Sequence, residues 1–196
     1  MFTFSSLLRH NLERFESGKW DYLITACATC TSTLKKVWPY LSENETPEIR
    51  ERVAALAEKT LDISQLLVSV LKIPMDAVSD SGIGVTYHDP CHLKKSLGVA
   101  DQPRALIRAA DGYQFREMPE PDACCGMGGS FNLQYYELSV KIGTKKRDQI
   151  ISTNASVLAT GCPACMMQIS DMLSRAGDSV AVKHFIEIYA ESLKKA

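Results

Sequence analysis

Apolar residues along the chain fall into two kinds of spacing, one helical and one extended. Helical spacing predicts amphipathic helices over residues 4–17 and 136–151, and a third helix whose apolar stripe is formed by Ile63, Leu66, Leu67, Val70 and Leu71. Short apolar runs predict buried strands at residues 22–25, 83–88, 114–118, 156–160 and 180–182. Because strands alternate with helices, the pattern predicts an α/β fold with mainly parallel sheets flanked by helices.

Turn and capping residues mark where several helices begin. Thr46 followed by Pro47 is typical of an N-cap and a first helical turn, and Asp62 is expected to cap the helix that ends at Pro74. Further helices are predicted at residues 31–40, from residue 101, from within residues 162–165, and over residues 184–194.

Composition narrows the class of protein. The 196 residues are 45% hydrophobic and 23% charged with a formal net charge of −1, so the chain is globular and has no basic stripe that favours nucleic acid. The sequence has no apolar run of the roughly 18 residues that a membrane span needs, and the N-terminus turns polar too early for a signal peptide. A cytoplasmic location is therefore expected. The helix at 136–151 carries basic residues expected to form a solvated face, namely Lys141, Lys145, Lys146 and Arg147.

The seven cysteines are the main chemical signal. Disulfides rarely persist in the cytoplasm, so C-x-x-C spacing indicates metal ligands or redox groups. Sites in parallel sheets form at the carboxyl ends of strands, and two of the cysteines directly follow predicted strands. We expect five cysteines to gather at one metal site: Cys91, Cys124, Cys125, Cys162 and Cys165.

The residues around these cysteines suit an anionic metal cluster. A helix start stabilises thiolates, and soft thiolates favour iron–sulfur clusters, zinc or Cu(I). Gly126, Gly128 and Gly129 let the backbone approach closely, so that turn N–H groups can cradle the cluster. Five thiolates exceed the four that a cubane or a tetrahedral zinc needs, so either one is spare or the cluster is not an ordinary cube. His88 and His92 are expected to form hydrogen bonds or turn contacts rather than to ligate, because sulfur suffices.

The sequence also contains an internal repeat. Leu23–Cys30 resembles Leu158–Cys165 at an offset of 135 residues, the difference between positions 27 and 162, and residues 62–71 resemble 184–193. We therefore divide the chain into residues 1–75, the C-terminal part of a first repeat, and residues 76–196, a complete second repeat. The same offset would place the first repeat's counterpart of Cys125 before Met1, so the chain is expected to be the C-terminal part of a longer protein.

The cysteine pattern resembles a known family. Cys91, Cys124-Cys125-Gly126 and Cys162-x-x-Cys165, with the surrounding Tyr87–Leu93, resemble the cysteine-rich CCG domain of heterodisulfide reductase and of the iron–sulfur subunits of glycolate, lactate and glycerol-3-phosphate oxidases. Three further segments look closest to the lactate/glycolate type: Ser130-Phe131, Cys165–Gln168 and His184–Glu187.

The resemblance implies two CCG repeats and a four-iron cluster, non-cubane in heterodisulfide reductase, held by the five cysteines. Cys27 and Cys30 match only the end of the first motif. Without the three missing partners, any metal on this pair needs ligands from outside the chain. The isolated chain is also expected to lose its cluster easily, and zinc remains an alternative metal.

The implied function is a non-catalytic electron-transfer subunit of a lactate/glycolate-type oxidoreductase. It would relay electrons from a flavin-containing oxidase subunit to quinone or another acceptor, in the cytoplasm or, through its partners, at the inner face of the membrane. Dinucleotide-binding, Walker and nucleophile-elbow motifs are absent from the sequence, which agrees with this role. Two alternatives stay open: direct reduction of a disulfide substrate, as in heterodisulfide reductase, and a structural zinc module.

Overall fold

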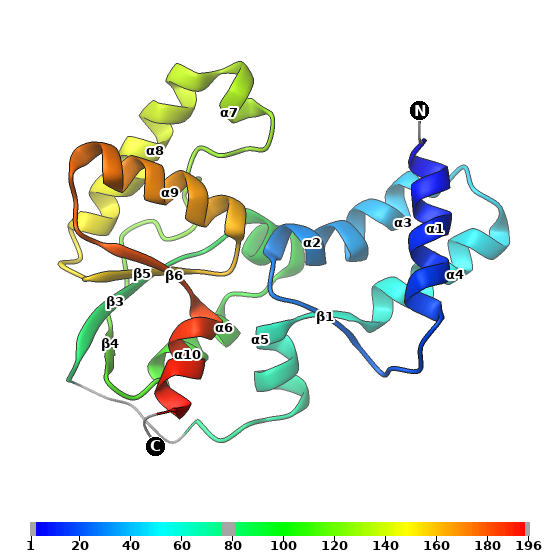
Figure 1. The fold of residues 1–196 in the computed structure, drawn as a ribbon, viewed down its shortest axis with the longest axis horizontal. Coiled ribbons are helices and arrows are strands. Elements are labelled where there is room, and N and C mark those ends of the chain that lie inside the picture. The colour runs from blue at the N-terminus through cyan, green and yellow to red at the C-terminus, as the bar shows by residue number, and fades with distance from the viewer. Residues whose placement is uncertain (1–2, 76–80, 195–196) are drawn as a thin grey trace.

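The computed structural model describes residues 3–75 and 81–194 and consists of two parallel sheets with helices on their faces (Figure 1). The first half contains α1 (Phe4–Glu16), β1 (Leu23–Thr25), α2 (Ala28–Ser32), the π-helix η1 (Thr33–Val37), α3 (Trp38–Leu41), α4 (Pro47–Lys59), β2 (Thr60–Asp62), α5 (Ile63–Gln65) and the π-helix η2 (Leu66–Val70). The second half contains β3 (Ile83–His88), the π-helix η3 (His92–Ser96), α6 (Asp101–Arg108), β4 (Tyr113–Phe115), α7 (Phe131–Gln134), α8 (Tyr136–Ile151), β5 (Val157–Thr160), α9 (Pro163–Ala176), β6 (Ala181–His184) and α10 (Phe185–Leu193).

All strand pairs in the described residues are parallel. The larger sheet has the order β4-β3-β5-β6, and β1 pairs with β2 in a separate two-stranded sheet. The α/β class with parallel sheets flanked by helices, predicted from the alternation of apolar patterns, is confirmed. Because β3 and β5 are neighbours in register, the segments that follow their carboxyl ends lie side by side.

The central strand β5 buries both of its faces, which explains its continuous apolar run. Leu158 points to one face, where it packs with Ile150 of α8 and Ile169 of α9. Val157 and Ala159 point to the other face, where α6 and α10 cover the sheet. Side chains alternate along a strand, so helices on both faces bury the apolar residues of β5. The polar residue of this strand, Thr160 at its carboxyl end, is also buried and donates a hydrogen bond to the carbonyl of His88 at 3.1 Å. These two cores fix the ends of β3 and β5 relative to α9.

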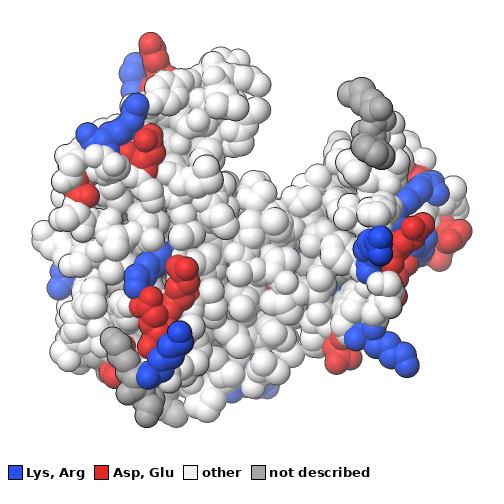
Figure 2. Space-filling view, in the orientation of Figure 1, with Lys and Arg blue, Asp and Glu red and all other residues white. Residues whose placement is uncertain are grey.

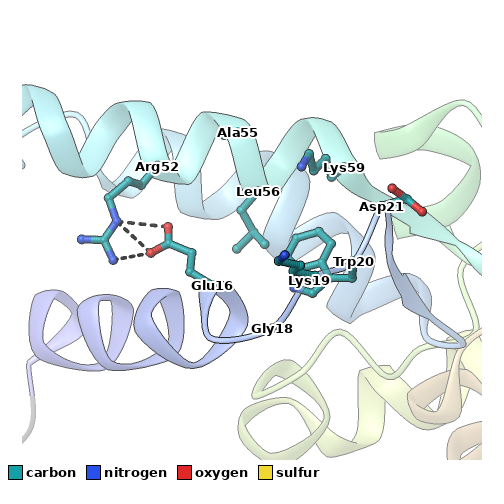
Figure 3. Close-up of a pocket in the computed structure, with 9 residues that line it drawn as sticks. All are labelled: Glu16, Gly18, Lys19, Trp20, Asp21, Arg52, Ala55, Leu56 and Lys59. Atoms are coloured by element: carbon teal, nitrogen blue, oxygen red, sulfur yellow. Dashed lines mark hydrogen bonds and ion pairs between the residues drawn. The ribbon is translucent and has the colours of Figure 1, made fainter.

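The first half has its own smaller core between α1 and α4. Leu8 and Leu12 of α1 pack against apolar residues of α4, namely Ile49, Val53 and Leu56. At the edge of this core, Arg52 pairs with Glu16 at 2.6 Å, and Trp20 lies beside Leu56 in a surface pocket of about 410 Å³ (Figure 3). No cysteine lines this pocket.

The internal repeat is visible in the strand pairing. β1 pairs with β2 so that Thr25 lies opposite Asp62, and β5 pairs with β6 so that Thr160 lies opposite His184. Asp62 and His184 then cap the helix that follows, each with a capping box. The halves also share a core, because Ala28 packs in the cluster of α8 and α9 and its N–H donates to the carbonyl of Gly161 at 2.9 Å. The division at residues 75/76 borders residues 76–80, outside the described residues, and stays a prediction.

Several local expectations need correction. The helix after the first C-x-x-C begins at Ala28 rather than Thr31, because the Cys27 side chain caps it. β2 and α7 have no counterpart in the predicted elements, because three or four residues carry too little periodicity. Lys146, expected on a solvated face, is buried and donates a hydrogen bond to the carbonyl of Glu120 at 2.8 Å. Among the described residues, no helix is both long and apolar enough to cross a membrane.

Candidate metal centre

The fold brings the five predicted cysteines to the carboxyl ends of β3 and β5. Cys91 follows β3 after a short Asp89-Pro90 turn and is the N-cap residue of η3, whereas Cys162 follows β5 and is the N-cap of α9. Cys165 lies in the first turn of α9. Cys124 and Cys125 come from the loop between β4 and α7.

These cysteines line one cavity of about 170 Å³. Cys125, Cys162 and Cys165 are buried, whereas Cys91 and Cys124 are exposed. The cavity is lined by Thr29, His88, Cys91, His92, Cys124, Cys125, Met127, Gly128, Gly129, Cys162, Ala164 and Cys165. The buried thiols therefore form the floor of a site that is open on the side of the exposed pair.

The remaining two cysteines lie outside this cavity. Cys30 is exposed and lines a separate apolar pocket with residues of α1 and β1 such as Phe15 and Leu23. Cys27 is half-buried, and burial raises the pKa of its thiol to about 11. The chain thus separates a group of five cysteines from a pair, as its spacing predicts.

The glycines after Cys125 allow the loop to turn back toward the cysteines. Gly126, Gly128 and Gly129 have φ values of +93°, +52° and +61°, a region that favours glycine. A Cβ on Gly126 would lie 2.5 Å from the carbonyl oxygen of Ser139, so the loop packs directly on α8. The N–H of Gly126 donates to Cys124 Sγ at 3.3 Å, whereas Gly128 and Gly129 line the cavity.

Hydrogen bonds between the thiols of the cavity shift their pKa values in opposite directions. Hydrogen bonds from the thiols of Cys124 and Cys165 lower the pKa of Cys125 and raise their own. A hydrogen bond from Cys165 lowers the pKa of Cys162 to about 5, and Thr29 and backbone N–H groups of the α9 first turn add to this effect. Thiolate sulfur is a soft anionic donor for a metal, so hydrogen bonds that lower the pKa of Cys125 and Cys162 suit metal binding.

One site residue comes from the first half of the chain. Thr29 Oγ1 lies 3.3 Å from Cys162 Sγ and 3.1 Å from His92 Nδ1. The cysteine spacing does not predict a role for Thr29, because Thr29 lies between Cys27 and Cys30 in the C-x-x-C segment of the first repeat. The repeat itself contained the signal, since Thr29 corresponds to Ala164, which lines the same cavity.

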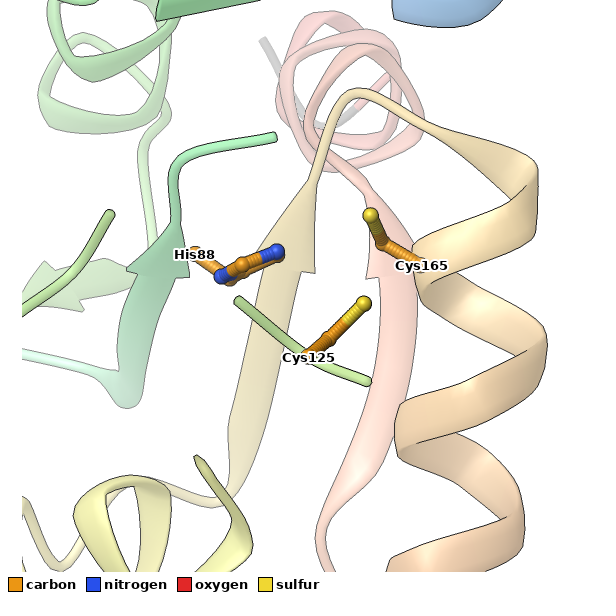
Figure 4. Close-up of side chains that lie close together, drawn as sticks. All are labelled: His88, Cys125 and Cys165. Atoms are coloured by element: carbon orange, nitrogen blue, oxygen red, sulfur yellow. The ribbon is translucent and has the colours of Figure 1, made fainter. Parts of the chain in front are cut away.

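His88 lies at the cavity floor. Its side chain is 1% exposed and its Nδ1 lies 3.1 Å from the carbonyl oxygen of Pro121. A ring nitrogen of His88 and the sulfur atoms of Cys125 and Cys165 all lie within 4.8 Å of one another (Figure 4). Neutral imidazole and thiolate are the donors that zinc and iron prefer in buried sites.

Comparison with known proteins agrees with this geometry. The family model of the cysteine-rich CCG domain matches residues 1–35 and 85–170, a range that contains all seven cysteines. This chain belongs to the CCG family. The match in two segments fits the two copies of the strand–cysteine–helix unit described above.

Curated relatives in this family cover nearly the whole chain. Lactate utilization protein A of an Exiguobacterium species is 30% identical over 190 residues, which are 97% of this chain and 76% of that protein. The same-named protein of Oceanobacillus iheyensis is 33% identical over 168 residues, 86% of this chain and 68% of its own length. The probable glycolate oxidase iron-sulfur subunit of Bacillus subtilis is 32% identical over 192 residues, 97% of this chain but 43% of its own length.

Charged residues next to the Asp89-Pro90 turn form a partly buried network around Asp89 and Arg104. Arg104 donates two hydrogen bonds of 2.8 Å to the fully buried carboxylate of Asp89 and two more, of 2.8 and 2.9 Å, to Glu117. Lys94 lies 3.3 Å from Asp89, and the buried Lys146 has its pKa lowered to about 8 by burial. A buried charge needs a partner, so this network fixes the Asp89-Pro90 turn that positions Cys91.

The residues present fit an iron–sulfur cluster. Soft thiolates converge on a cavity, positive-φ glycines line one wall, and a buried imidazole nitrogen has no hydrogen-bond partner among the described residues. The chemistry of this donor set also fits a single zinc ion.

Proposed function

We propose that this chain is an iron–sulfur electron-transfer subunit, or the C-terminal part of one, in a lactate- or glycolate-type oxidoreductase. The observation that carries the proposal is the convergence of Cys91, Cys124, Cys125, Cys162 and Cys165 on one cavity. The names of the relatives, lactate utilization protein A and probable glycolate oxidase iron-sulfur subunit, support the choice of complex.

Each part of the site has a role in this proposal. The five cysteines hold the cluster, and the loop of Gly126, Gly128 and Gly129 lets the chain wrap around it. When bound, the cluster supplies one-electron transfer. The chain itself needs no acid or base, because the hydride chemistry belongs to a flavin-containing oxidase subunit.

Partner groups would approach from the exposed side of the cavity, where Cys91 and Cys124 lie. Figure 2 shows a hollow that lies between α7 and α8 on one side and α1 on the other. Few charged side chains lie in this hollow, and most charged side chains in this view gather on the outer surface of the molecule. Exposed apolar side chains extend along the α7–α8 part: Leu133, Tyr135, Tyr136 and Leu138. A largely apolar contact with the partner subunits, in the cytoplasm or at the inner face of the membrane, is therefore part of the proposal.

A second candidate is direct reduction of a disulfide substrate. It is favoured by the same openness, since Cys91 and Cys124 leave one side of the cavity accessible. Turnover of small disulfides by the reconstituted chain with a chemical electron donor would support this candidate, whereas electron transfer without such turnover would support the first.

The cluster itself is tested by anaerobic reconstitution with iron and sulfide. We expect a brown protein with about four irons per chain and an electron paramagnetic resonance signal after oxidation or reduction. The variant Cys125→Ser should lose the cluster, whereas Cys30→Ser, which changes a cysteine outside the cavity, should retain it. A colourless product that holds one zinc would overturn the electron-transfer proposal in favour of a structural zinc module.

A further inference from the structure

The cavity floor contains a buried nitrogen atom whose bonding capacity is unused. His88 Nε2 is buried and has no hydrogen-bond partner among the described residues. An unpaired buried polar atom is costly, so each one in a native protein needs an explanation, and a bound ion is one of those explanations.

The other ring nitrogen determines which form of the imidazole is present. Nδ1 lies 3.1 Å from the carbonyl oxygen of Pro121. A carbonyl oxygen only accepts hydrogen bonds, so Nδ1 carries the proton and donates it. In the neutral ring, Nε2 then has a free lone pair and can act as an electron-pair donor.

The imidazole ring of His88 lies next to two of the cysteines. His88, Cys125 and Cys165 come together from β3, the loop after β4, and α9, with one donor atom of each within 4.8 Å of the others. Figure 4 shows a ring nitrogen of His88 on the side that faces the two sulfur atoms. A backbone carbonyl that holds the second ring nitrogen is the arrangement typical of metal-ligating histidines.

We propose that His88 Nε2 is a ligand of the metal centre, so that the site has a mixed donor set of one imidazole and the cysteine thiolates. The inference rests on the proposed iron–sulfur function and goes beyond it, because the five-cysteine motif assigns no histidine. Ligation would also explain the conformation of His88. The Pro121 carbonyl holds the buried ring through Nδ1, and the metal would then bond to the other ring nitrogen.

His92 provides a matched control. It lines the same cavity, but its Nδ1 already has Thr29 Oγ1 as a partner at 3.1 Å. Of the four histidines in the chain, His88 and His92 are the two that line this cavity.

The test is pulsed electron paramagnetic resonance on the reconstituted chain, produced with either ordinary or ¹⁵N-labelled histidine. We expect a strong nitrogen coupling that changes with the label, disappears in His88→Ala and persists in His92→Ala. If His88→Ala does not fold, a label-sensitive coupling that persists in His92→Ala still supports the assignment to His88. A cluster with full iron content and no histidine coupling would overturn the inference while leaving the proposed function intact.

A different outcome is expected if the proposed iron–sulfur function is wrong. If the chain binds only zinc, the cluster proposal fails, and X-ray absorption at the zinc edge then decides the role of His88. Nitrogen scattering that is lost in His88→Ala would support ligation, whereas an all-sulfur shell would overturn it.

Discussion

The hydroxyl of Thr29 lies 3.3 Å from the sulfur of Cys162, a residue 133 positions further along the chain. Thr29 belongs to the C-x-x-C segment of the first repeat, and Cys162 belongs to the corresponding segment of the second. The same hydroxyl lies 3.1 Å from His92 Nδ1, so one side chain connects the first half to two residues of the cavity. The first repeat therefore contributes directly to the site of the second.

This contact predicts a shift in reduction potential. If Cys162 ligates the proposed cluster, a hydrogen bond to its sulfur stabilises the more negative, reduced state, so loss of this bond should lower the potential. Since a hydrogen bond contributes about 1 kcal/mol, Thr29→Val should lower the midpoint potential by on the order of 50 mV. Thr29→Ser, which keeps the hydroxyl, should stay near the wild-type value. A spectroelectrochemical titration measures both, and an unchanged potential in Thr29→Val would contradict the assigned contact.

The glycine loop predicts that two alanine variants lose different amounts of stability. Gly126→Ala places a Cβ 2.5 Å from the Ser139 carbonyl oxygen at a φ of +93°, so both the loop and α8 must shift. We expect a loss of about 2–4 kcal/mol in the free energy of unfolding. Gly129→Ala meets no atom within 4 Å at a φ of +61° and should cost only about 1 kcal/mol. Urea unfolding of the reduced, metal-free chain compares them, and similar losses would refute the close approach at Gly126.

The buried ion pair of Arg104 and Asp89 predicts that the stability of the fold depends strongly on both side chains. Arg104→Met leaves the fully buried carboxylate of Asp89 with Lys94, at 3.3 Å, as its remaining ion-pair partner among the described residues. Removing one partner of a buried ion pair costs about 3–5 kcal/mol, so this variant should unfold at much lower urea concentration. The double variant Asp89→Asn with Arg104→Met should recover part of the loss. If the double variant is instead as unstable as the sum of its single variants, the two residues do not act as a pair.

Lys146 predicts a pH dependence of stability. Burial lowers the pKa of its ammonium from the ordinary 10.5 to about 8, although nearby groups including Cys125 and Asp122 oppose this effect. Between pH 8 and 10.5 the unfolded chain holds a proton that the folded chain has released, so the free energy of unfolding rises with pH. Relative to Lys146→Met, the wild-type metal-free chain should gain stability across this window in denaturant titrations. A constant difference between the two proteins would show that Lys146 keeps its ordinary pKa.

The sequence predicts long, periodic segments well, because the same spacing of apolar residues is repeated over many positions and identifies the buried face. The helix at 136–151 and the strand at 83–88 match α8 and β3, and Thr46 and Asp62 cap helices as expected. β2 escaped prediction because three residues show no period, although the repeat could have indicated it, since Asp62 corresponds to His184 at the end of β6. Lys146 was misplaced because charge alone does not reveal that a helix turns that position inward.

The fold class and the grouping of the candidate metal ligands follow from local features of the chain. Cysteine spacing, the glycines after Cys125 and the order of strands and helices are local properties, so they can be read directly along the sequence. Which other groups meet the cysteines depends instead on the three-dimensional arrangement. Thr29 and His88 reach the cavity through the pairing of β3 with β5 and the packing of the first half on the second. Such contacts depend on side-chain packing between distant segments, which no local pattern encodes.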